Sequence, residues 1–416
     1  MRILLVNYRY FISGGPEKYM FNIKTMLENQ GHEVIPFSIH SNKNVATEYS
    51  KYFVEPIGGR DATYFEEVKK TPKSIWQMLT RSIYSKEVEK AIKREIDDVK
   101  PDLVYIIHFV NKLSPSVIRG ARKKGIPVVL RLSDYFLLCP RFDFIYEKRE
   151  CEECLTKGYR SCIKKRCVKG SLFASVVRVF SMKFHKLIHV YDGVYAFITP
   201  SEFLKQKLSA NGFEEEKIHC IPTFTASKTK VGEPQIGSYG LYFGRITEEK
   251  GVETVVQAYE KLQKYTVKIM GDDTTEEAIR LKRYIKEHKI KNIEFLGFKS
   301  GEELEDIIKG ARFTLIPSIW YDNLPNTALE SFQYSKPVIA SNIGSLPELV
   351  VDGENGYLFK PADAEDLIKK IKLLDDDTVV EKMGAASRRR LESRFSPETH
   401  YEALMKVFSE AVKNNK

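Results

Sequence analysis

The chain has no run of about 18 or more apolar residues, the length that an α-helix needs to cross a bilayer. Its opening stretch, MRILLVNYRY, is too short and too polar for a secretory signal peptide. We therefore expect a cytoplasmic protein, which can still rest at the inner face of the membrane as a peripheral protein.

Signals for nucleic-acid binding are also missing. The sequence has neither a zinc finger of paired cysteines and histidines nor a basic segment interleaved with aromatics. It has no GxGxxG after its first predicted strand, so a dinucleotide site is not favoured. Internal repeats and low-complexity tracts are absent, which leaves an ordinary globular chain.

The 416 residues are enough for two domains, and the 43% apolar share is enough for two cores. The net charge of +10 is uneven. Residues 1–200 carry 34 Lys and Arg against 21 Asp and Glu, whereas the remainder carries 32 against 35. A basic first half indicates an anionic partner, such as a phosphorylated substrate or anionic lipid, or simply a solvated lysine-rich surface.

Short runs rich in Val, Ile and Leu alternate with amphipathic helical stretches. Continuous apolar strands of this kind are typical of parallel sheets that helices cover on both faces. We predict two successive doubly wound α/β domains. The predicted strands are 2–8, 33–39, 102–109, 127–132 and 194–200 in the first domain, and 240–245, 266–271, 293–298, 313–318 and 337–341 in the second.

The predicted domains are residues 1–222 and 223–395. The boundary falls in TFTASKTKVGEPQIGS, which has no apolar period. Residues 139–167 interrupt the βα rhythm as a cysteine-rich insertion of the first domain. The amphipathic tail at 396–416 follows the last strand.

Ligands of parallel α/β sheets bind where strands end and helices begin. Gly14 and Gly15 lie between the first strand and a predicted helix, where glycine lets the backbone approach a phosphate or a sugar. Arg245 and Lys250 flank the turn after GLYFG, where two cations could neutralise a diphosphate. Each pair alone could equally be ordinary loop glycines or solvated surface charges.

The stretch WYDNLPNTALESF predicts a helix start. Asn323 is the expected cap and Pro325 suits the first turn. The backbone amides of Asn326 and Thr327 would then face out of the helix start, where a phosphate is favoured.

Two acids accompany this helix start. Glu330 lies about one turn further in, where a carboxylate can accept hydrogen bonds from both hydroxyls of a ribose. Asp322 lies just before the helix and could reach a hexose. The helix macrodipole could by itself account for Asp322, but it accounts less well for the deeper Glu330.

Taken in this order, these motifs resemble those of the family-4, group 1 glycosyltransferases. The GGPE loop, the GRI-x3-KG turn, the acid-x7-Glu motif and PELVVDGENGYLF fall at the family's positions. The resemblance covers nearly the whole chain. It implies the GT-B fold, in which two Rossmann-like domains face one another across a cleft, with the segment 396–416 crossing back to the first domain.

The resemblance implies a retaining hexosyltransferase that moves a sugar from a nucleotide-diphosphate sugar to a carbohydrate or lipid-linked acceptor, without a catalytic metal. Arg245 and Lys250 would hold the diphosphate, Glu330 the ribose and Asp322 the donor sugar. The glycine loop would close over the donor. Such an enzyme would serve the synthesis of a cell-surface polysaccharide or glycolipid. The sequence leaves the donor base, sugar, acceptor, linkage and oligomeric state open.

Two departures from the family pattern stand out. Family members mostly have Glu where this chain has Asp322. They also often carry a His, which contacts the donor sugar, at the position of Ser133. His108 and Asp134 are the candidates for that role.

Five of the six cysteines lie within 29 residues. Their spacing predicts a structural zinc site of four thiolates, because stable disulfides are not expected in the cytoplasm. The predicted ligands are Cys151, Cys154, Cys162 and Cys167, with Cys139 as the substitute. An Fe–S cluster or a group of inert thiols would also be compatible with these cysteines.

The basic, amphipathic segment at 164–189 after this cluster could lie on an anionic membrane, or could be a helix of the first domain with its basic face in water. Two other functions stay open for the whole chain. They are a sugar-nucleotide epimerase on the same fold and a non-catalytic protein that binds sugar nucleotides.

Overall fold

The computed structural model describes residues 1–59, 68–69, 71–225 and 235–415. Its first lobe is built on a parallel sheet in the order β2-β1-β3-β4-β7-β8. The strands are β1 (Arg2–Asn7), β2 (Glu33–Phe37), β3 (Leu103–His108), β4 (Val128–Arg131), β7 (Ala196–Thr199) and β8 (Ile218–Cys220), and a small hairpin adds β5 (Ile145–Tyr146) and β6 (Arg149–Glu150).

The second lobe has a parallel sheet in the order β11-β10-β9-β12-β13-β14. Counted along the chain, this is the 3-2-1-4-5-6 order of a Rossmann sheet, with the switch point between β9 and β12. The strands are β9 (Tyr239–Phe243), β10 (Thr266–Met270), β11 (Ile293–Gly297), β12 (Ala311–Ile316), β13 (Val338–Ser341) and β14 (Gly356–Phe359).

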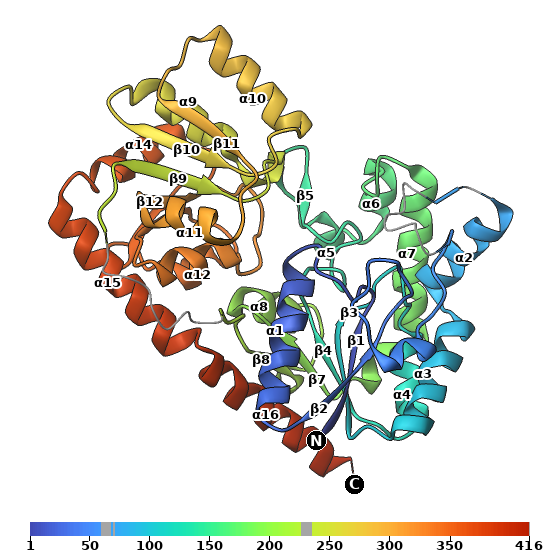
Figure 1. Cartoon of the computed structure of the whole chain (residues 1–416). Helices are drawn as coiled ribbons and strands as arrows, with labels where there is room; N and C mark the ends of the chain where they lie inside the picture. Colours follow the sequence, from blue (N-terminus) through green and yellow to red (C-terminus); the bar gives the residue numbers. More distant parts are fainter. Residues whose placement is uncertain (60–67, 70, 226–234, 416) are drawn as a thin grey trace.

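Helices flank both sheets (Figure 1). Those of the first lobe are α1 (Gly15–Asn29), α2 (Pro72–Ile83), α3 (Lys86–Val99), α4 (Ser116–Lys123), α5 (Glu153–Thr156), α6 (Arg160–Lys165), α7 (Leu172–Leu187) and α8 (Glu202–Ser209). Those that follow are α9 (Val252–Lys261), α10 (Glu276–Glu287), α11 (Gly301–Lys309), α12 (Asn326–Gln333), α13 (Leu346–Leu349), α14 (Ala364–Lys372), α15 (Asp377–Arg394) and α16 (Pro397–Asn414).

The side chains of β1 show why its sequence is continuously apolar. Leu4 and Val6 join the core cluster that contains residues of α3 and α4. Ile3 and Leu5 point to the other face and join residues of α1 and α16. Both faces of the strand are therefore buried, as the lack of alternation predicted.

The last helix returns to the first lobe (Figure 1), where Leu404 and Phe408 of α16 lie in the same core cluster as Ile3 and Leu5. His400 fixes the crossing. Its Nδ1 lies 2.7 Å from the carbonyl oxygen of Pro222, and its Nε2 lies 3.0 Å from the Tyr19 hydroxyl. A carbonyl can only accept, so Nδ1 carries the proton and Nε2 accepts from the tyrosine.

The predicted doubly wound α/β architecture is confirmed, and all ten predicted strands are present. Four strands were missed: β8 and β14, each at one edge of a six-stranded sheet and only three or four residues long, and the two-residue strands β5 and β6 of the hairpin. The first sheet ends at Cys220 and the second begins at Tyr239, on either side of the predicted boundary at 222–223. Part of the predicted linker, at 226–234, lies outside the described residues.

Burial lowers the pKa of His400 to about 3, below the ordinary value of about 6.5. As the pH falls below about 6.5, the unfolded chain takes up a proton at this position and the folded chain does not, so the unfolding free energy falls. Between pH 7 and pH 5 the unfolding free energy of the wild type should therefore fall by about 2 kcal/mol more than that of His400→Gln, as measured by denaturant unfolding. His189→Gln, at an exposed histidine, is the control, and equal pH dependence in both variants would contradict the assignment.

Candidate active site

A cleft of about 630 Å³ lies between the two lobes. From the first lobe it is lined by the loop after β1 and by residues that end or follow β3 and β4. From the second lobe it is lined by the turn after β9 and the loop that connects β12 to α12. The carboxyl ends of both parallel sheets thus meet at one cavity, and in the second lobe they do so at the switch point.

Most of the predicted site residues line this cleft. They are Gly14, Gly15, Arg245, Lys250, Asp322, Asn326 and Thr327. Gly15 faces the second lobe directly, because a Cβ built on it would lie 3.7 Å from Nδ2 of Asn326. The glycine loop and the start of α12, which are more than 300 residues apart in the chain, therefore face each other across the cavity.

Lys250 and Asp322 form an ion pair. The Nζ of Lys250 lies 2.6 Å from Oδ2 of Asp322, and the hydroxyl of Ser318 donates to the same oxygen at 2.8 Å. Only 16% and 9% of the two side chains are exposed. The pair holds the ammonium at the cleft wall, where it also lies 5.2 Å from the ring centre of Trp320.

Gly251 allows this pairing. Its φ of +67° lies in the left-handed region, and a Cβ there would lie 2.0 Å from the carbonyl oxygen of Pro317. The amide of Ile319 donates to the carbonyl of Glu249 at 3.0 Å. Only glycine lets the turn after β9 approach the loop after β12 this closely. This explains why glycine follows Lys250 in the sequence.

Arg245 is held more loosely. Its side chain is 67% exposed, and its guanidinium lies 3.8 Å from the carboxylate of Glu249. The backbone beneath it is fixed, because the buried Tyr242 donates its hydroxyl to the Arg245 carbonyl. The turn thus presents one cation fixed in an ion pair, Lys250, and one largely exposed cation, Arg245.

The start of α12 differs from the prediction. The helix begins at Asn326, and Pro325 with extended backbone occupies the cap position. Asn323 is not the cap, because its side-chain oxygen instead accepts from Ser201 of the first lobe at 3.0 Å. Leu324, with φ of 58°, forces the chain to turn between the two. Since no side chain caps α12, its first amides remain directed at the cleft.

Glu330 lies on α12 outside the set of residues that line the cavity. Its carboxylate is 2.7 Å from Nζ of Lys18 on α1, and 21% of the side chain is exposed. The acid therefore points toward the other lobe rather than into the interior. In this arrangement Lys18 and Glu330 bridge the two lobes beside the cleft.

The first lobe contributes charged side chains to the cleft that the sequence motifs did not predict. Arg9 lies 3.9 Å from Glu17, and the Ser13 hydroxyl links them by hydrogen bonds. Arg131 is buried, lies 3.9 Å from the ring centre of Tyr19, and donates to the Ile221 carbonyl. A charged residue at the end of the apolar strand PVVLRL was the signal that could have indicated Arg131.

His108 and Ser133 both line the cleft, whereas Asp134 is not among its lining residues. Nε2 of His108 lies 3.8 Å from the carboxylate of Asp134. Burial raises the pKa of Asp134, and the neighbouring His108 opposes that rise. Of the two candidates for the missing family histidine, His108 is the one that reaches the cavity.

The predicted zinc site is not supported. Within residues 1–59, 68–69, 71–225 and 235–415, no group of three or more His, Cys, Asp or Glu could hold a metal ion. Cys162 has the free thiols of Cys154 and Cys167 as neighbours, and the contact with Cys154 raises the pKa of the Cys162 thiol. Burial raises the pKa of Cys139 to about 11 and also raises the pKa of Cys167, whereas the contact with Cys162 lowers the pKa of Cys154. Cys151 has Lys165 as its neighbour, at 3.9 Å.

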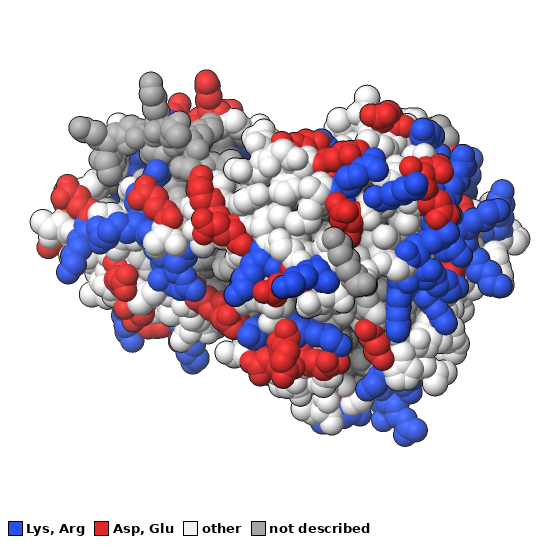
Figure 2. All heavy atoms as spheres, turned by 90° about the horizontal axis from the view of Figure 1, so that it is seen from below, with Lys and Arg blue, Asp and Glu red and all other residues white. Residues whose placement is uncertain are grey.

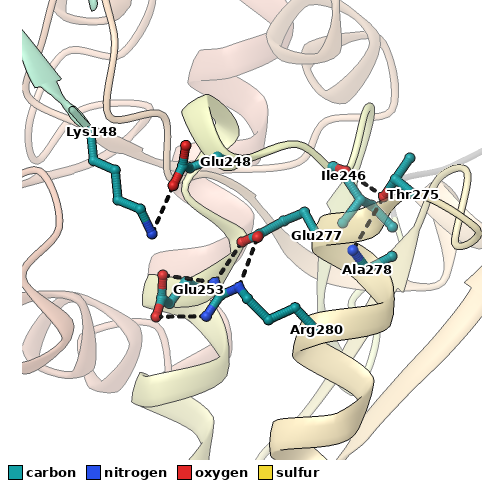
Figure 3. A network of polar contacts seen from close by, with 8 residues as sticks. All are labelled: Lys148, Ile246, Glu248, Glu253, Thr275, Glu277, Ala278 and Arg280. Atoms are coloured by element: carbon teal, nitrogen blue, oxygen red, sulfur yellow. Dashed lines mark hydrogen bonds and ion pairs between the residues drawn. The ribbon is translucent and has the colours of Figure 1, made fainter. Parts of the chain in front are cut away.

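The cysteine-rich insertion makes contacts between the lobes. Lys148, at its hairpin, lies 2.7 Å from Glu248, in the turn that carries Arg245 and Lys250 (Figure 3). Glu152 accepts a hydrogen bond from the Tyr321 hydroxyl at 2.6 Å. The insertion therefore contacts both second-lobe segments that form the site.

The second lobe is similar in sequence to known proteins. Residues 224–390 match the family model described as glycosyl transferases group 1. The match covers less than half of the chain. An uncharacterised glycosyltransferase of Methanocaldococcus jannaschii is 28% identical over 173 residues, which cover 42% of this chain and 48% of the relative. The capsular polysaccharide biosynthesis glycosyltransferase CapM of Staphylococcus aureus is 25% identical over 179 residues, covering 42% and 46%.

The chain spans about half the length of the curated relatives it matches, 48% and 46% for the first ones. Solved structures match over the full length. Sucrose-phosphate synthase of Thermosynechococcus elongatus has a TM-score of 0.71 at 17% identity, covering 99% of both chains. HepE of Anabaena, solved with UDP and glucose, has a TM-score of 0.63 at 15% identity, covering 98% and 99%. The fold is GT-B, and the family match and relatives support an enzyme of the glycosyltransferase class.

The ion pair at the cleft allows a stability test. Lys250→Met would leave Asp322 as a mostly buried, unpaired charge, and we expect a loss of about 3 kcal/mol in unfolding free energy. Lys261→Met, which breaks an exposed pair with Glu365, is the matched control, with an expected cost below about 1 kcal/mol. Equal costs in chemical unfolding would contradict the role given to the pair.

Proposed function

We propose that this protein is a retaining family-4 glycosyltransferase that uses a nucleotide-diphosphate sugar as donor. The observation that carries the proposal is the pairing of a cationic turn, Arg245 and Lys250, with the uncapped start of α12 at one cleft wall. A diphosphate between them would meet positive charge on one side and backbone amides of Asn326 and Thr327 on the other.

The nucleotide-sugar assignment draws on two further observations. The matched family model covers the lobe that carries these groups. The structurally similar HepE was solved with UDP and glucose. UDP-glucose is therefore the first donor to test on this chain.

In the proposed reaction, the bond between the anomeric carbon and the diphosphate oxygen breaks. A bond from the anomeric carbon to the acceptor hydroxyl oxygen forms on the same face of the sugar, and the hydroxyl proton passes to the departing diphosphate. Arg245 and Lys250 stabilise the charge that develops on the diphosphate, so no step needs a metal. Asp322 orients Lys250 through their ion pair and lies beside the donor sugar.

Glu330 would bind the ribose hydroxyls. When the donor enters, Lys18 would move away from the Glu330 carboxylate or share it with the ribose. His108 would contact the donor sugar in place of the family histidine. Gly14 and Gly15 would close over the donor from the first lobe, where a side chain would narrow the gap to Asn326.

The acceptor is proposed to be a carbohydrate or a lipid-linked carbohydrate in the synthesis of a cell-surface polysaccharide or glycolipid. The similarity to the capsular enzyme CapM supports this assignment. Within the part of the chain that the structure describes, no helix has the length and apolar character to span a bilayer. We propose cytoplasmic location with peripheral attachment at the inner face of the membrane.

Arg245→Ala should lower kcat by about 10²–10³-fold, because it removes a charge that stabilises the departing diphosphate. The control is Arg280→Ala in the same lobe, whose guanidinium is engaged by Glu253 and Glu277 (Figure 3). Steady-state kinetics with UDP-sugars and a released-UDP assay measure both. If the two variants were equally active, the cationic turn would not serve the reaction.

Glu330→Ala should weaken donor binding by about tenfold or more, because hydrogen bonds to a charged group are each worth about 1.5–3 kcal/mol. Glu28→Ala, which breaks the Lys24 pair on α1, is the control. Calorimetric titration with the donor that most raises the melting temperature measures the change. An unchanged dissociation constant would place the ribose elsewhere.

Incubation with the donor, first alone and then with carbohydrate acceptors, distinguishes the other two functions. An epimerised nucleotide sugar would identify an epimerase. Tight binding without turnover on any carbohydrate acceptor would identify a binding protein. Sugar transfer that needs an acceptor supports the proposal.

A further inference from the structure

Two helices of the first lobe expose large apolar side chains. On α7, Phe173 is 65% exposed and Leu187 is 74% exposed, and on α2, Trp76 is 68% exposed. Leu172, Val176 and Phe180 of α7 are also exposed. We call these six residues the α2–α7 surface. Five of the six lie on the single helix α7, which is more than the scattered apolar residues of an ordinary surface.

The spacing on α7 places these side chains on one face. Phe173, Val176, Phe180 and Leu187 follow one another at steps of three, four and seven residues, which is the period of one helix stripe. At 16 residues the helix is about 24 Å long. It therefore carries a continuous apolar stripe along its length.

The opposite face of α7 is anchored in the lobe. Arg178 donates to the carbonyl of Phe136 at 2.8 Å. His185 lies 2.7 Å from the carbonyl oxygen of Ile83, and Ser181 donates to Ser82, so α7 is tied to the end of α2. The two helices lie side by side at the edge of the first lobe, away from the second lobe (Figure 1). The apolar stripe is thus a fixed feature of a folded helix.

The charge around this surface is mainly positive, although Glu87, Glu153 and Asp192 lie just outside the two segments that follow. Residues 154–191 contain nine Lys and Arg and no Asp or Glu, and residues 68–86 contain five and none. The exposed cations beside α7 are Arg160, Lys164, Arg166, Lys169, Lys183 and Lys186. Figure 2, which views the molecule from below, shows many Lys and Arg side chains on the right, with Asp and Glu among them.

We propose that the α2–α7 surface docks on a bilayer that contains anionic lipid. Aromatic and aliphatic side chains on one face with lysines beside them are the features of a helix that lies in the membrane interface. The apolar side chains would enter the acyl boundary by about 5–10 Å, and the cations would meet lipid phosphates.

Other occupants fit less well. A second copy of the chain would bring one cationic surface against another, which like-charge repulsion opposes. A nucleic acid would satisfy the cations but leave the apolar stripe in water. The inference rests on the proposed function and deepens it, because it assigns the surface of the proposed transferase that faces the lipid. Vesicle binding can be measured without a sugar donor.

The test is flotation of the full chain with vesicles of phosphatidylcholine alone and with added phosphatidylglycerol. We expect binding to the anionic vesicles, weakened at high salt, and little binding to the neutral ones. The double variant Phe173→Ser, Phe180→Ser should bind at least tenfold more weakly. Lys164→Glu with Lys169→Glu should lose the preference for anionic lipid without touching the apolar stripe.

The matched control is Ile279→Ser with Phe298→Ser, two exposed apolar residues of the second lobe, which should bind as the wild type does. Circular dichroism melts and the thermal shift with UDP-glucose verify folding and donor binding separately. The proposal is overturned if the chain ignores both kinds of vesicle, or if the control and the α7 variants lose binding equally. Self-association in light scattering that only the α7 variants abolish, without vesicle binding, would assign the surface to a second copy.

Discussion

The ion pair between Lys250 and Asp322 joins the two second-lobe segments on which the site depends. These residues follow β9 and β12, the strands on either side of the switch point. The turn and the loop could each adopt many arrangements alone. The close approach at Gly251 and the shared carboxylate with Ser318 select one, which directs an ammonium at the start of α12. A fixed charge of this kind needs little reorganisation when an anion arrives.

The first lobe completes the cavity from the opposite side, and several polar contacts hold the lobes in register. Lys18 meets Glu330, Lys148 meets Glu248, and Ser201 meets Asn323. Most of these contacts are partly exposed, so each is weak alone. Apolar packing also joins the lobes, because Tyr321 of the second lobe lies against the rings of Tyr135, Phe144 and Phe203 of the first, and α16 packs on the first lobe.

The sequence was sufficient to predict the fold because most central strands are buried on both faces, which makes them continuous apolar runs. The edge strands β8 and β14 are short and at most half of their residues are buried, so they lack that signal. The motif glycines, the cationic turn and the start of α12 were predicted because each directly follows a strand. The role of Arg131 was missed because its partner Ile221 lies 90 residues further along the chain, although its charge at the end of an apolar strand was a signal. Arg9 has close partners in sequence, Ser13 and Glu17, but no motif marked it.

The errors have physical causes as well. Asn323 has the right chemistry for a cap, but the left-handed Leu324 turns the chain and sends Asn323 to the other lobe. The cysteine spacing suggested a zinc site, yet no group of three or more possible ligands comes together among the described residues, and the cysteines are free. Spacing along a chain does not fix how the side chains are arranged in space.

The most direct measurement is a crystal structure of the protein with a UDP-sugar bound. The account requires the diphosphate between the Arg245–Lys250 turn and the first amides of α12, with the ribose hydroxyls on Glu330 and Lys18 displaced or shared. A nucleotide bound outside this cleft, or bound within it while Glu330 keeps Lys18 as its sole partner, would contradict the account.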